Sequence, residues 1–174
     1  MSTPWVLSHR CDPDARVLAD RHYNRQSIGA KNFAPPGRCL VMKTYPTDAF
    51  WVTSWPFAEY VRHDWAGAWV CSAFRNEGNH LSSELIRFAI AHTRARWEPP
   101  ELGMITFVDR SKTRQKKNPG YCYLMAGFEP VGYTKGGLVA LQILPDAMPD
   151  PVPLLELQGA FSFAPADPPR EPEA

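Results

Sequence analysis

The chain has 174 residues, of which 44% are hydrophobic and 21% are charged, and its formal net charge is +1. These values are typical of one globular domain with a core of its own. The sequence has no apolar run of the roughly 18 residues that span a bilayer, no secretory leader pattern and no CxxC pair among its four cysteines. We therefore expect a cytoplasmic protein without a membrane span, a zinc finger or a disulfide framework.

Charge is unevenly distributed along the chain. Residues 145–174 hold six acidic side chains, one basic side chain and eight of the 18 prolines. Residues 1–144 therefore carry 18 basic and 12 acidic side chains. We predict one domain over 1–144, followed by a mostly irregular, Pro-rich acidic tail over 145–174. The positive domain favours polyanionic partners.

The first half of the chain alternates turn signals with apolar runs. Asp12-Pro13-Asp14 marks a helix start, because a capping residue precedes proline at the first helical position. We expect this helix to run towards His22-Tyr23. Strands are marked by β-branched, aromatic and aliphatic residues. The expected elements are a loop over 26–37, strands over 38–45 and 49–55 joined by a turn over 46–48, and a strand over 68–74.

The second half alternates helix and strand patterns. Apolar residues at helical spacing predict a half-buried helix that starts at Ser82 and stops at Pro99-Pro100. A strand over 102–108, a short helix over 120–126 and a hairpin over 131–144 follow. This order predicts an α+β fold in which a mixed central sheet is flanked by helices and has hairpins at both ends.

The turn between the strand over 68–74 and the helix from Ser82 is the first candidate site. Unpaired N–H groups at a helix start, together with the helix dipole, form a cradle for phosphate. We predict a pyrophosphate site for a nucleotide-bearing cofactor here, although an ordinary strand-to-helix turn is the alternative. The residues that would form it are Phe74, Arg75, Asn76, Glu77, Gly78, Ser82 and Ser83.

Two places carry candidate proton-transfer groups. His22 follows the first helix, and its imidazole suits proton transfer near neutral pH, while Tyr23 can position an amine. The alternative is that His22 only caps the helix end. Asp109 ends an apolar strand, near the usual ligand crevice of an open αβ sheet. It could accept a proton from an amine, orient the amine, or simply form a turn.

Cations gather after Asp109 and in the first loop. Phosphates of a nucleic acid or of a nucleotide cofactor are their natural partners, and a solvated loop is the alternative. Four tryptophans could stack on a flipped base or pack in the core: Trp51, Trp55, Trp65 and Trp69. The predicted DNA-binding residues are Arg25, Lys31, Arg38, Arg110, Lys112, Arg114, Lys116 and Lys117.

Over roughly residues 12–144 the chain resembles the GNAT superfamily of acyl-CoA-dependent N-acyltransferases. Arg75-Asn76-Glu77-Gly78-Asn79-His80 is similar to the first half of the family's Arg/Gln-x-x-Gly-x-Gly/Ala turn, which lies between its fourth strand and third helix. His80 stands where a small residue is usual. The run from Tyr121 to Phe128 resembles the family's Tyr-x-x-x-Gly-Phe ending. The resemblance implies acetyl-CoA or another acyl-CoA as cofactor.

A narrower resemblance concerns the substrate. Asp20-Arg21-His22-Tyr23-Asn24-Arg25, together with Phe107-Val108-Asp109, is similar to the phage Mom family, in which Ser usually stands at the place of Asn24. That resemblance implies a DNA base modification enzyme of the adenine N6-carbamoylmethylation type. Tyr121 or Tyr123 would protonate the thiolate. Because the two tyrosines are two positions apart on one helix, only one of them should face the site. We expect the other to lie in the core.

Two other functions stay open at this stage. One is an N-acetyltransferase that acts on a small amine or a protein, and the other is a non-enzymatic nucleic-acid-binding module. The expected partners are DNA and acyl-CoA, and a homodimer is left open. His22, His80 and Asp109 have no ligand spacing that would itself indicate a metal.

Overall fold

A computed structural model describes residues 2–112 and 120–154. Three helices and seven strands form its framework, with short 3₁₀ turns at Ala58–Tyr60 and Pro145–Ala147. The elements are β1 (Trp5–Leu7), α1 (Pro13–Asp20), β2 (Arg38–Thr44), β3 (Ala49–Trp55), β4 (Trp69–Asn76), α2 (Ser82–Arg96), β5 (Met104–Val108), α3 (Tyr121–Ala126), β6 (Glu129–Tyr133) and β7 (Val139–Ile143). Within the described residues, no helix has the length and apolar character needed to cross a membrane.

The seven strands form one sheet in the order β1-β2-β3-β4-β5-β7-β6. Neighbours are antiparallel except β4 and β5, which are parallel. The predicted α+β class, with a mixed sheet and hairpins at both ends, is thus confirmed. The parallel pairing covers only Trp69 with Met104 and Val70 with Ile105, so the two strands separate beyond those residues.

An irregularity in β4 lies beside this separation. Val52 pairs with Ala73 and Thr53 pairs with Cys71, which leaves Ser72 as an extra residue in β4. Such a β-bulge bends its strand and removes the extra residue from the ladder. The carbonyl groups of Cys71 and Ser72 both accept hydrogen bonds from side chains, one of them from the Thr106 hydroxyl at 3.3 Å.

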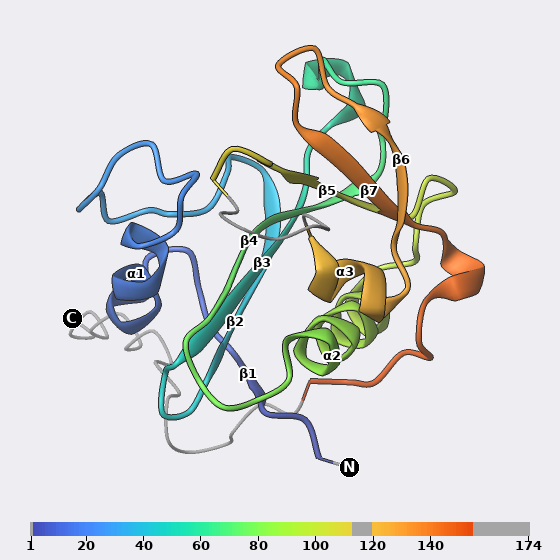
Figure 1. Cartoon of the computed structure of the whole chain (residues 1–174). Helices are drawn as coiled ribbons and strands as arrows, with labels where there is room; N and C mark the ends of the chain where they lie inside the picture. Colours follow the sequence, from blue (N-terminus) through green and yellow to red (C-terminus); the bar gives the residue numbers. More distant parts are fainter. Residues whose placement is uncertain (1, 113–119, 155–174) are drawn as a thin grey trace, which may run out of the picture.

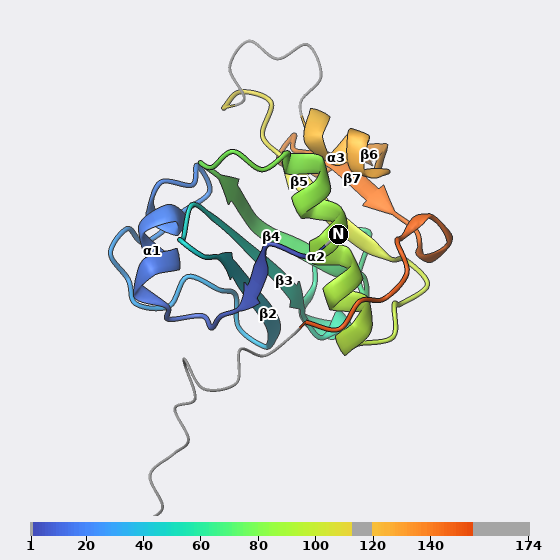
Figure 2. The ribbon, with the colours of Figure 1, turned by 90° about the horizontal axis from the view of Figure 1, so that it is seen from below.

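The helices cover both faces of the sheet (Figures 1 and 2). Helices α2 and α3 pack on one face over the larger core, which includes Trp51, Trp69 and Met104. Helix α1 packs on the other face, where Leu18 meets Phe50 and Val52. The burial of these large apolar side chains is the main favourable contribution to folding.

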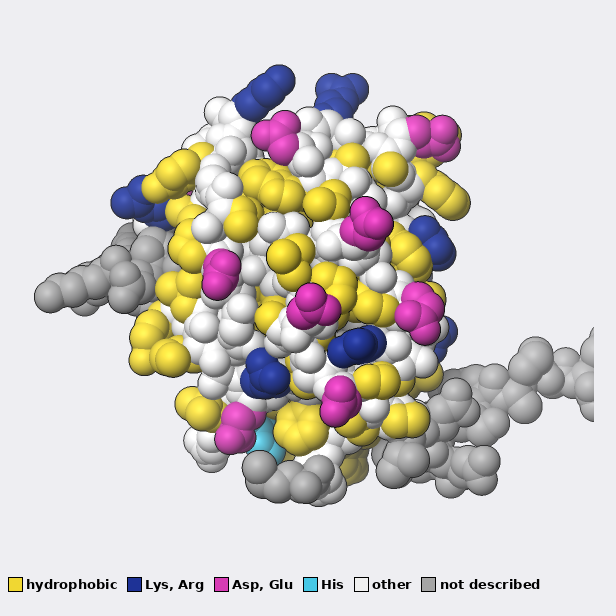
Figure 3. All heavy atoms as spheres, turned by 90° about the vertical axis from the view of Figure 1, so that its right-hand side faces the viewer, with side chains coloured by type: hydrophobic (Ala, Val, Ile, Leu, Met, Phe, Trp, Pro, Cys, Tyr) yellow, Lys and Arg dark blue, Asp and Glu magenta, His cyan; other side chains and the backbone are white. Residues whose placement is uncertain are grey.

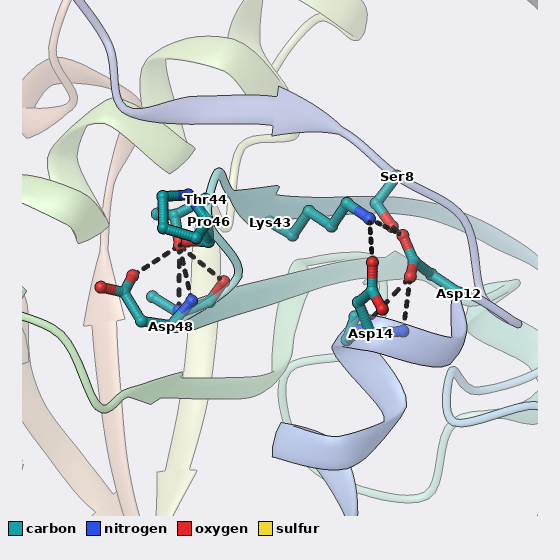
Figure 4. A network of polar contacts seen from close by, with 9 residues as sticks. Ser8, Asp12, Asp14, Lys43, Thr44, Pro46 and Asp48 are labelled. Atoms are coloured by element: carbon teal, nitrogen blue, oxygen red, sulfur yellow. Dashed lines mark hydrogen bonds and ion pairs between the residues drawn. The ribbon is translucent and has the colours of Figure 1, made fainter. Parts of the chain in front are cut away.

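The start of α1 is fixed to the sheet by charge. The Asp12 carboxylate accepts the amides of Asp14 and Ala15, as an N-cap does. Lys43 Nζ lies 2.7 Å from Asp12 and 3.3 Å from Asp14 (Figure 4). Burial alone raises the pKa of Asp12, but the bonds from Lys43, Ser8 and the helix amides outweigh it, and the pKa is lowered. The far end of α1, where His22 follows, is thereby held over the sheet.

Two boundaries differ from the sequence prediction. Helix α1 ends at Asp20 rather than reaching His22-Tyr23. Strand β1 was not predicted, because three residues show no periodicity; it is held by pairing with β2 and by a bond of 2.8 Å from Trp5 Nε1 to the Leu85 carbonyl of α2. Strand β1 therefore depends on contacts with distant parts of the chain, whereas the end of α1 is marked by local bonds from the Arg21 and His22 amides to the Leu18 and Ala19 carbonyls.

The described part of the predicted tail packs on α2. The amide of Val152 donates to the Ala91 carbonyl at 3.1 Å. The ring of His92, which is buried, bridges the Val152 carbonyl at 2.6 Å and the Thr3 hydroxyl at 2.8 Å. Packing against the domain therefore continues past residue 144 to the last described residue, Leu154, and residues 155–174 lie outside the described part.

Stability is expected to fall as the pH drops below about 6.5, the ordinary pKa of histidine. Burial lowers the pKa of His92, and the bond to Val152 only partly opposes this. The unfolded chain therefore binds more protons than the folded one between the two pKa values, so stability is lost as pH falls. Unfolding midpoints measured from neutral to mildly acidic pH test this.

Because the pKa values of His22 and His63 are also lowered by burial, a variant is needed to isolate His92. His92→Gln should show a flatter dependence of stability on pH than the parent chain. An unchanged slope would contradict the assignment to His92.

Replacing Gly103 with alanine is expected to reduce the free energy of unfolding by about 2–5 kcal/mol. Gly103 has φ of 63°, and a Cβ there would lie 2.0 Å from the main-chain oxygen of Ile143. A left-handed residue costs about 1–2 kcal/mol and overpacking adds about 1–3 kcal/mol. Denaturant unfolding measures the loss. Gly136→Ala is the control, since the nearest atom there is 3.9 Å away, and equal losses would refute the argument.

Candidate functional site

The candidate site begins where the chain leaves α1 and lies against β4. The rings of His22 and Tyr23 stack with centroids 4.6 Å apart. The next side chain, Asn24, donates from Nδ2 to the Ser72 carbonyl at 3.0 Å. The segment after α1 is thereby attached to the β-bulge, at the place where β4 separates from β5. Bulges commonly occur beside active sites because they redirect the strand.

Tyr23 connects this segment to the residues that follow β5. Burial raises the pKa of the Tyr23 phenol, and a hydrogen bond with the Asp109 main chain partly opposes the rise. The Tyr23 carbonyl accepts a bond of 3.4 Å from Lys112 Nζ. The structure therefore brings Tyr23 to Asp109 and Lys112, which lie far from it in the sequence.

Tyr123 enters the same region from α3. Its hydroxyl lies 3.6 Å from the sulfur of Cys71, and its ring makes edge contacts with Phe74 and Phe128. Burial raises the pKa of Tyr123 well above its ordinary value, so the group stays a protonated phenol near neutral pH. Tyr121 is 56% exposed. The two tyrosines point in different directions, as predicted: Tyr123 packs against the larger core, and Tyr121 lies on the surface.

The pKa values of Asp109 and His22 are both lowered, but the two residues are suited to different roles. Asp109 accepts from the hydroxyl and the amide of Ser111 at 2.6 and 2.9 Å, and mainly the hydroxyl bond lowers its pKa. A carboxylate so stabilised can orient an amine but is a weak proton acceptor. Burial, aided by the charge of Arg75, lowers the pKa of His22. Its neutral ring is the form that accepts a proton near pH 7.

The turn after β4 is organised by its own side chains. Asn76 accepts from the Gly78 amide at 2.9 Å and donates to the His80 carbonyl and the Ser82 hydroxyl at 2.7 and 3.0 Å. The Glu77 amide donates to the Asp48 carbonyl at 2.7 Å. The amides of Glu77 and Gly78, predicted to hold phosphate, are therefore already engaged within the protein.

Glycine at position 78 has a local structural reason. A Cβ there would lie 2.1 Å from a carboxylate oxygen of Asp48, which is itself fixed by a bond of 2.7 Å from the Thr44 hydroxyl (Figure 4). The close approach of the turn between β2 and β3 requires the small residue. Sequence reasoning assigned Gly78 to phosphate instead.

The main-chain N–H groups that have no acceptor among the described residues lie at the start of α2. Among the described residues, no acceptor is found for the amides of Ser82 and Ser83, and α2 has no side-chain cap at Leu81. The first amides of a helix of this length can bind an anion. Within the described residues, the amides of Ser82 and Ser83 are thus unengaged, whereas those of Glu77 and Gly78 are bonded within the protein; phosphate binding here stays a prediction.

An ion-pair network joins this turn to the end of α1. The Glu77 carboxylate contacts Arg21 and Arg75, each at 2.6 Å, and Arg75 also donates to the Arg21 carbonyl at 3.1 Å. Mainly through the Arg75 bond, the pKa of Glu77 is lowered. The sequence did not lead us to include Arg21 among the site residues. Its position immediately before His22 and Tyr23 could have indicated it.

The predicted DNA-binding residues are dispersed. Arg25 is used inside the first loop, where it pairs with Asp20 at 2.9 Å and donates to the Ala30 carbonyl at 2.7 Å. Arg38 stacks over Trp55 at 4.0 Å. In the strand register Arg38 is level with Trp69, three residues before Ser72, or on the order of 10 Å along the strand direction. Both guanidinium groups are thus engaged within the protein, and their part in DNA binding stays a prediction.

The remaining predicted cations differ in position. Arg110 contacts the hydroxyl of Tyr133 at 3.2 Å, Lys112 reaches Tyr23, and Lys31 is exposed in the first loop. Arg114, Lys116 and Lys117 lie outside the described residues. Figure 3 shows the face on the β6 and β7 side, where acidic, basic and apolar side chains are interspersed. That face offers no continuous positive surface.

Three further observations concern the other candidate groups. Burial raises the pKa of the Cys71 thiol to about 12, so this cysteine stays protonated and is a poor nucleophile. Within residues 2–112 and 120–154, no three His, Cys, Asp or Glu side chains gather as a metal site would require. Trp51 and Trp69 are fully buried and serve the core.

These features define an α+β protein with a mixed seven-stranded sheet and a candidate site at the separation of its one parallel strand pair. We compared the chain with models of known families, with curated proteins and with solved structures, and none of the three comparisons found a match.

Proposed function

We propose that this protein is a GNAT-like, acyl-CoA-dependent transferase that modifies an exocyclic amine of a DNA base, as the resemblance to the Mom family implies. The observation that carries the proposal is the meeting of His22, Tyr23 and Tyr123 around the separated strands, next to the open amides of α2. The turn after the fourth strand lies where the resemblance expects the cofactor phosphates.

Phosphate binding is supported at the start of α2 and by two arginines. Within the described residues the amides of Ser82 and Ser83 have no acceptor, and Arg21 and Arg75 lie beside the same turn. In the structure both guanidinium groups are paired with Glu77. Binding of an anion here therefore requires phosphate to share these arginines with Glu77, and we expect affinity to depend on salt.

The chemistry follows from the protonation states. Acyl-CoA, a co-substrate, supplies an activated acyl carbon. As the C–N bond forms and the C–S bond breaks, His22 takes the proton of the amine and Tyr123 gives its phenolic proton to the sulfur. Both groups are in the required form, because burial lowers the pKa of His22 and raises that of Tyr123. Asp109 orients the amine rather than deprotonating it.

The test is mass spectrometry of nucleosides from the DNA of cells that express the chain. A base of increased mass, absent in cells that express Tyr123→Phe, is the expected result. Unmodified DNA, together with binding of acetyl-CoA shown by calorimetry, would remove the DNA substrate and leave the transferase.

One observation favours a second candidate, an N-acetyltransferase that acts on a small amine or a protein. Arg25 is paired with Asp20 and the Ala30 carbonyl in its own loop, and Arg38 stacks over Trp55, so both guanidinium groups are already engaged within the protein. Duplex DNA binding separates the two functions, because contacts with phosphates make affinity fall steeply with salt.

A further inference from the structure

We propose that Asn24 is a positioning residue that holds His22 in the tautomer with the proton on Nδ1, which leaves Nε2 as the nitrogen that accepts a proton. The geometry of Asn24 stands independently, but its catalytic meaning rests on the proposed function. Sequence reasoning noted Asn24 only as a departure from the serine usual at this position.

The orientation of the Asn24 amide is fixed by the β-bulge. Its terminal group lies 3.0 Å from the Ser72 carbonyl, and a carbonyl oxygen can only accept. The atom that faces Ser72 is therefore the NH₂ group. Ser72 is the extra residue of the bulge, and pairing between β4 and β5 has already ended at Val70, so the Ser72 carbonyl is available for Asn24.

This orientation turns the amide oxygen towards His22. Asn24 Oδ1 is in hydrogen-bond contact with His22 Nδ1. Because Oδ1 has no hydrogen, the proton of that bond belongs to Nδ1. The sequence of donors and acceptors is then complete: His22 Nδ1–H donates to Asn24, and Asn24 Nδ2–H donates to Ser72.

One contact favours the other tautomer, and it is weaker. The main-chain amide of Asn24 lies 3.3 Å from the same ring nitrogen and would donate to it if Nδ1 were unprotonated. In that state two lone pairs, on Oδ1 and Nδ1, would face each other across the closer contact. The Nδ1–H tautomer avoids this repulsion, and it loses only the long hydrogen bond from the Asn24 main-chain amide.

The environment of the ring agrees with a neutral base. The Tyr23 ring stacks on His22 from its own segment. Burial and the positive charge of Arg75 lower the pKa of His22, and they outweigh the Asn24 bond and a hydrogen bond with the Phe74 main chain, which raise it. An orienting acceptor on one ring nitrogen is what a general base requires, since it presents the other nitrogen in a fixed direction.

The test is the tautomer of His22, read from long-range ¹H–¹⁵N correlation spectra of the full chain at a pH above the pKa of free histidine. The His22 signal, assigned with His22→Gln, should show protonated Nδ1. Asn24→Ala should convert it to the Nε2–H form that free histidine favours. Asn24→Asp should keep Nδ1–H, because a carboxylate still accepts, and should raise the pKa of His22.

Asn32→Ala is the matched control, an asparagine in the neighbouring loop whose side chain accepts from the Ala34 amide. It should leave the His22 signal unchanged. Protonated Nε2 in the parent chain, or an unchanged tautomer in Asn24→Ala, would overturn the proposal. The reading does not depend on activity, so unmodified DNA would refute the proposed function and leave the tautomer result standing.

Discussion

Replacing His22 with glutamine is expected to lower the rate of base modification by about 10²- to 10⁴-fold, the usual contribution of a general base. Glutamine fills a similar space and can hydrogen-bond to Asn24, but it cannot take a proton from an amine. The rate is measured as modified nucleoside formed per unit time by the purified protein with acyl-CoA and DNA.

His9→Gln is the control for this substitution, since His9 is exposed and bonds only within its own turn, at the Cys11 amide. It should keep the full rate. The parent rate should also decline as pH falls below the pKa of His22, which burial places below the ordinary value. A His22→Gln variant with undiminished activity would remove His22 from the mechanism.

Replacing Trp5 with alanine is expected to reduce the free energy of unfolding by about 3–5 kcal/mol. Trp5 is only 2% exposed and packs in the larger core, and its indole bond to the Leu85 carbonyl joins β1 to α2. Its loss leaves a cavity at the sheet edge and removes the attachment of β1. Urea unfolding followed by circular dichroism measures the change.

Two further variants separate the contribution of the indole hydrogen bond from that of core packing. Trp5→Phe keeps a ring in the core but removes the indole bond, so we expect a loss nearer 1 kcal/mol from the bond itself, plus a smaller packing term. Leu7→Ala lies on the same strand, but Leu7 is 38% exposed and should cost less than half as much. If Trp5→Ala cost no more than Leu7→Ala, β1 would not be anchored through Trp5.

The sequence predicted the elements whose patterns are local. The strands around the turn over 46–48 and the helix from Ser82 are long enough to show periodicity, and they form as expected. The tripeptide Trp5–Leu7 forms a strand only because β2 and α2 contact it, which no local pattern records. For the same reason, packing beyond residue 144 was missed.

The candidate site was predicted in part. His22, Tyr23, Asp109 and Tyr123 meet in the structure, and their positions at the ends of elements were the signal. The roles of Asn24 and Ser72 depend on a single extra residue in β4, and an insertion of this kind leaves no trace in one sequence.

The separation of β4 from β5 also determines what holds the site together. Beyond Val70 no ladder bond joins the two strands in the described residues, whereas on its other side β4 pairs with β3 as far as Asn76. Side chains bridge the gap instead: the Thr106 hydroxyl donates to the Cys71 carbonyl, and the Tyr123 hydroxyl lies 3.6 Å from the Cys71 sulfur. The shape of the site is therefore set by side chains that can be substituted one at a time rather than by main-chain pairing.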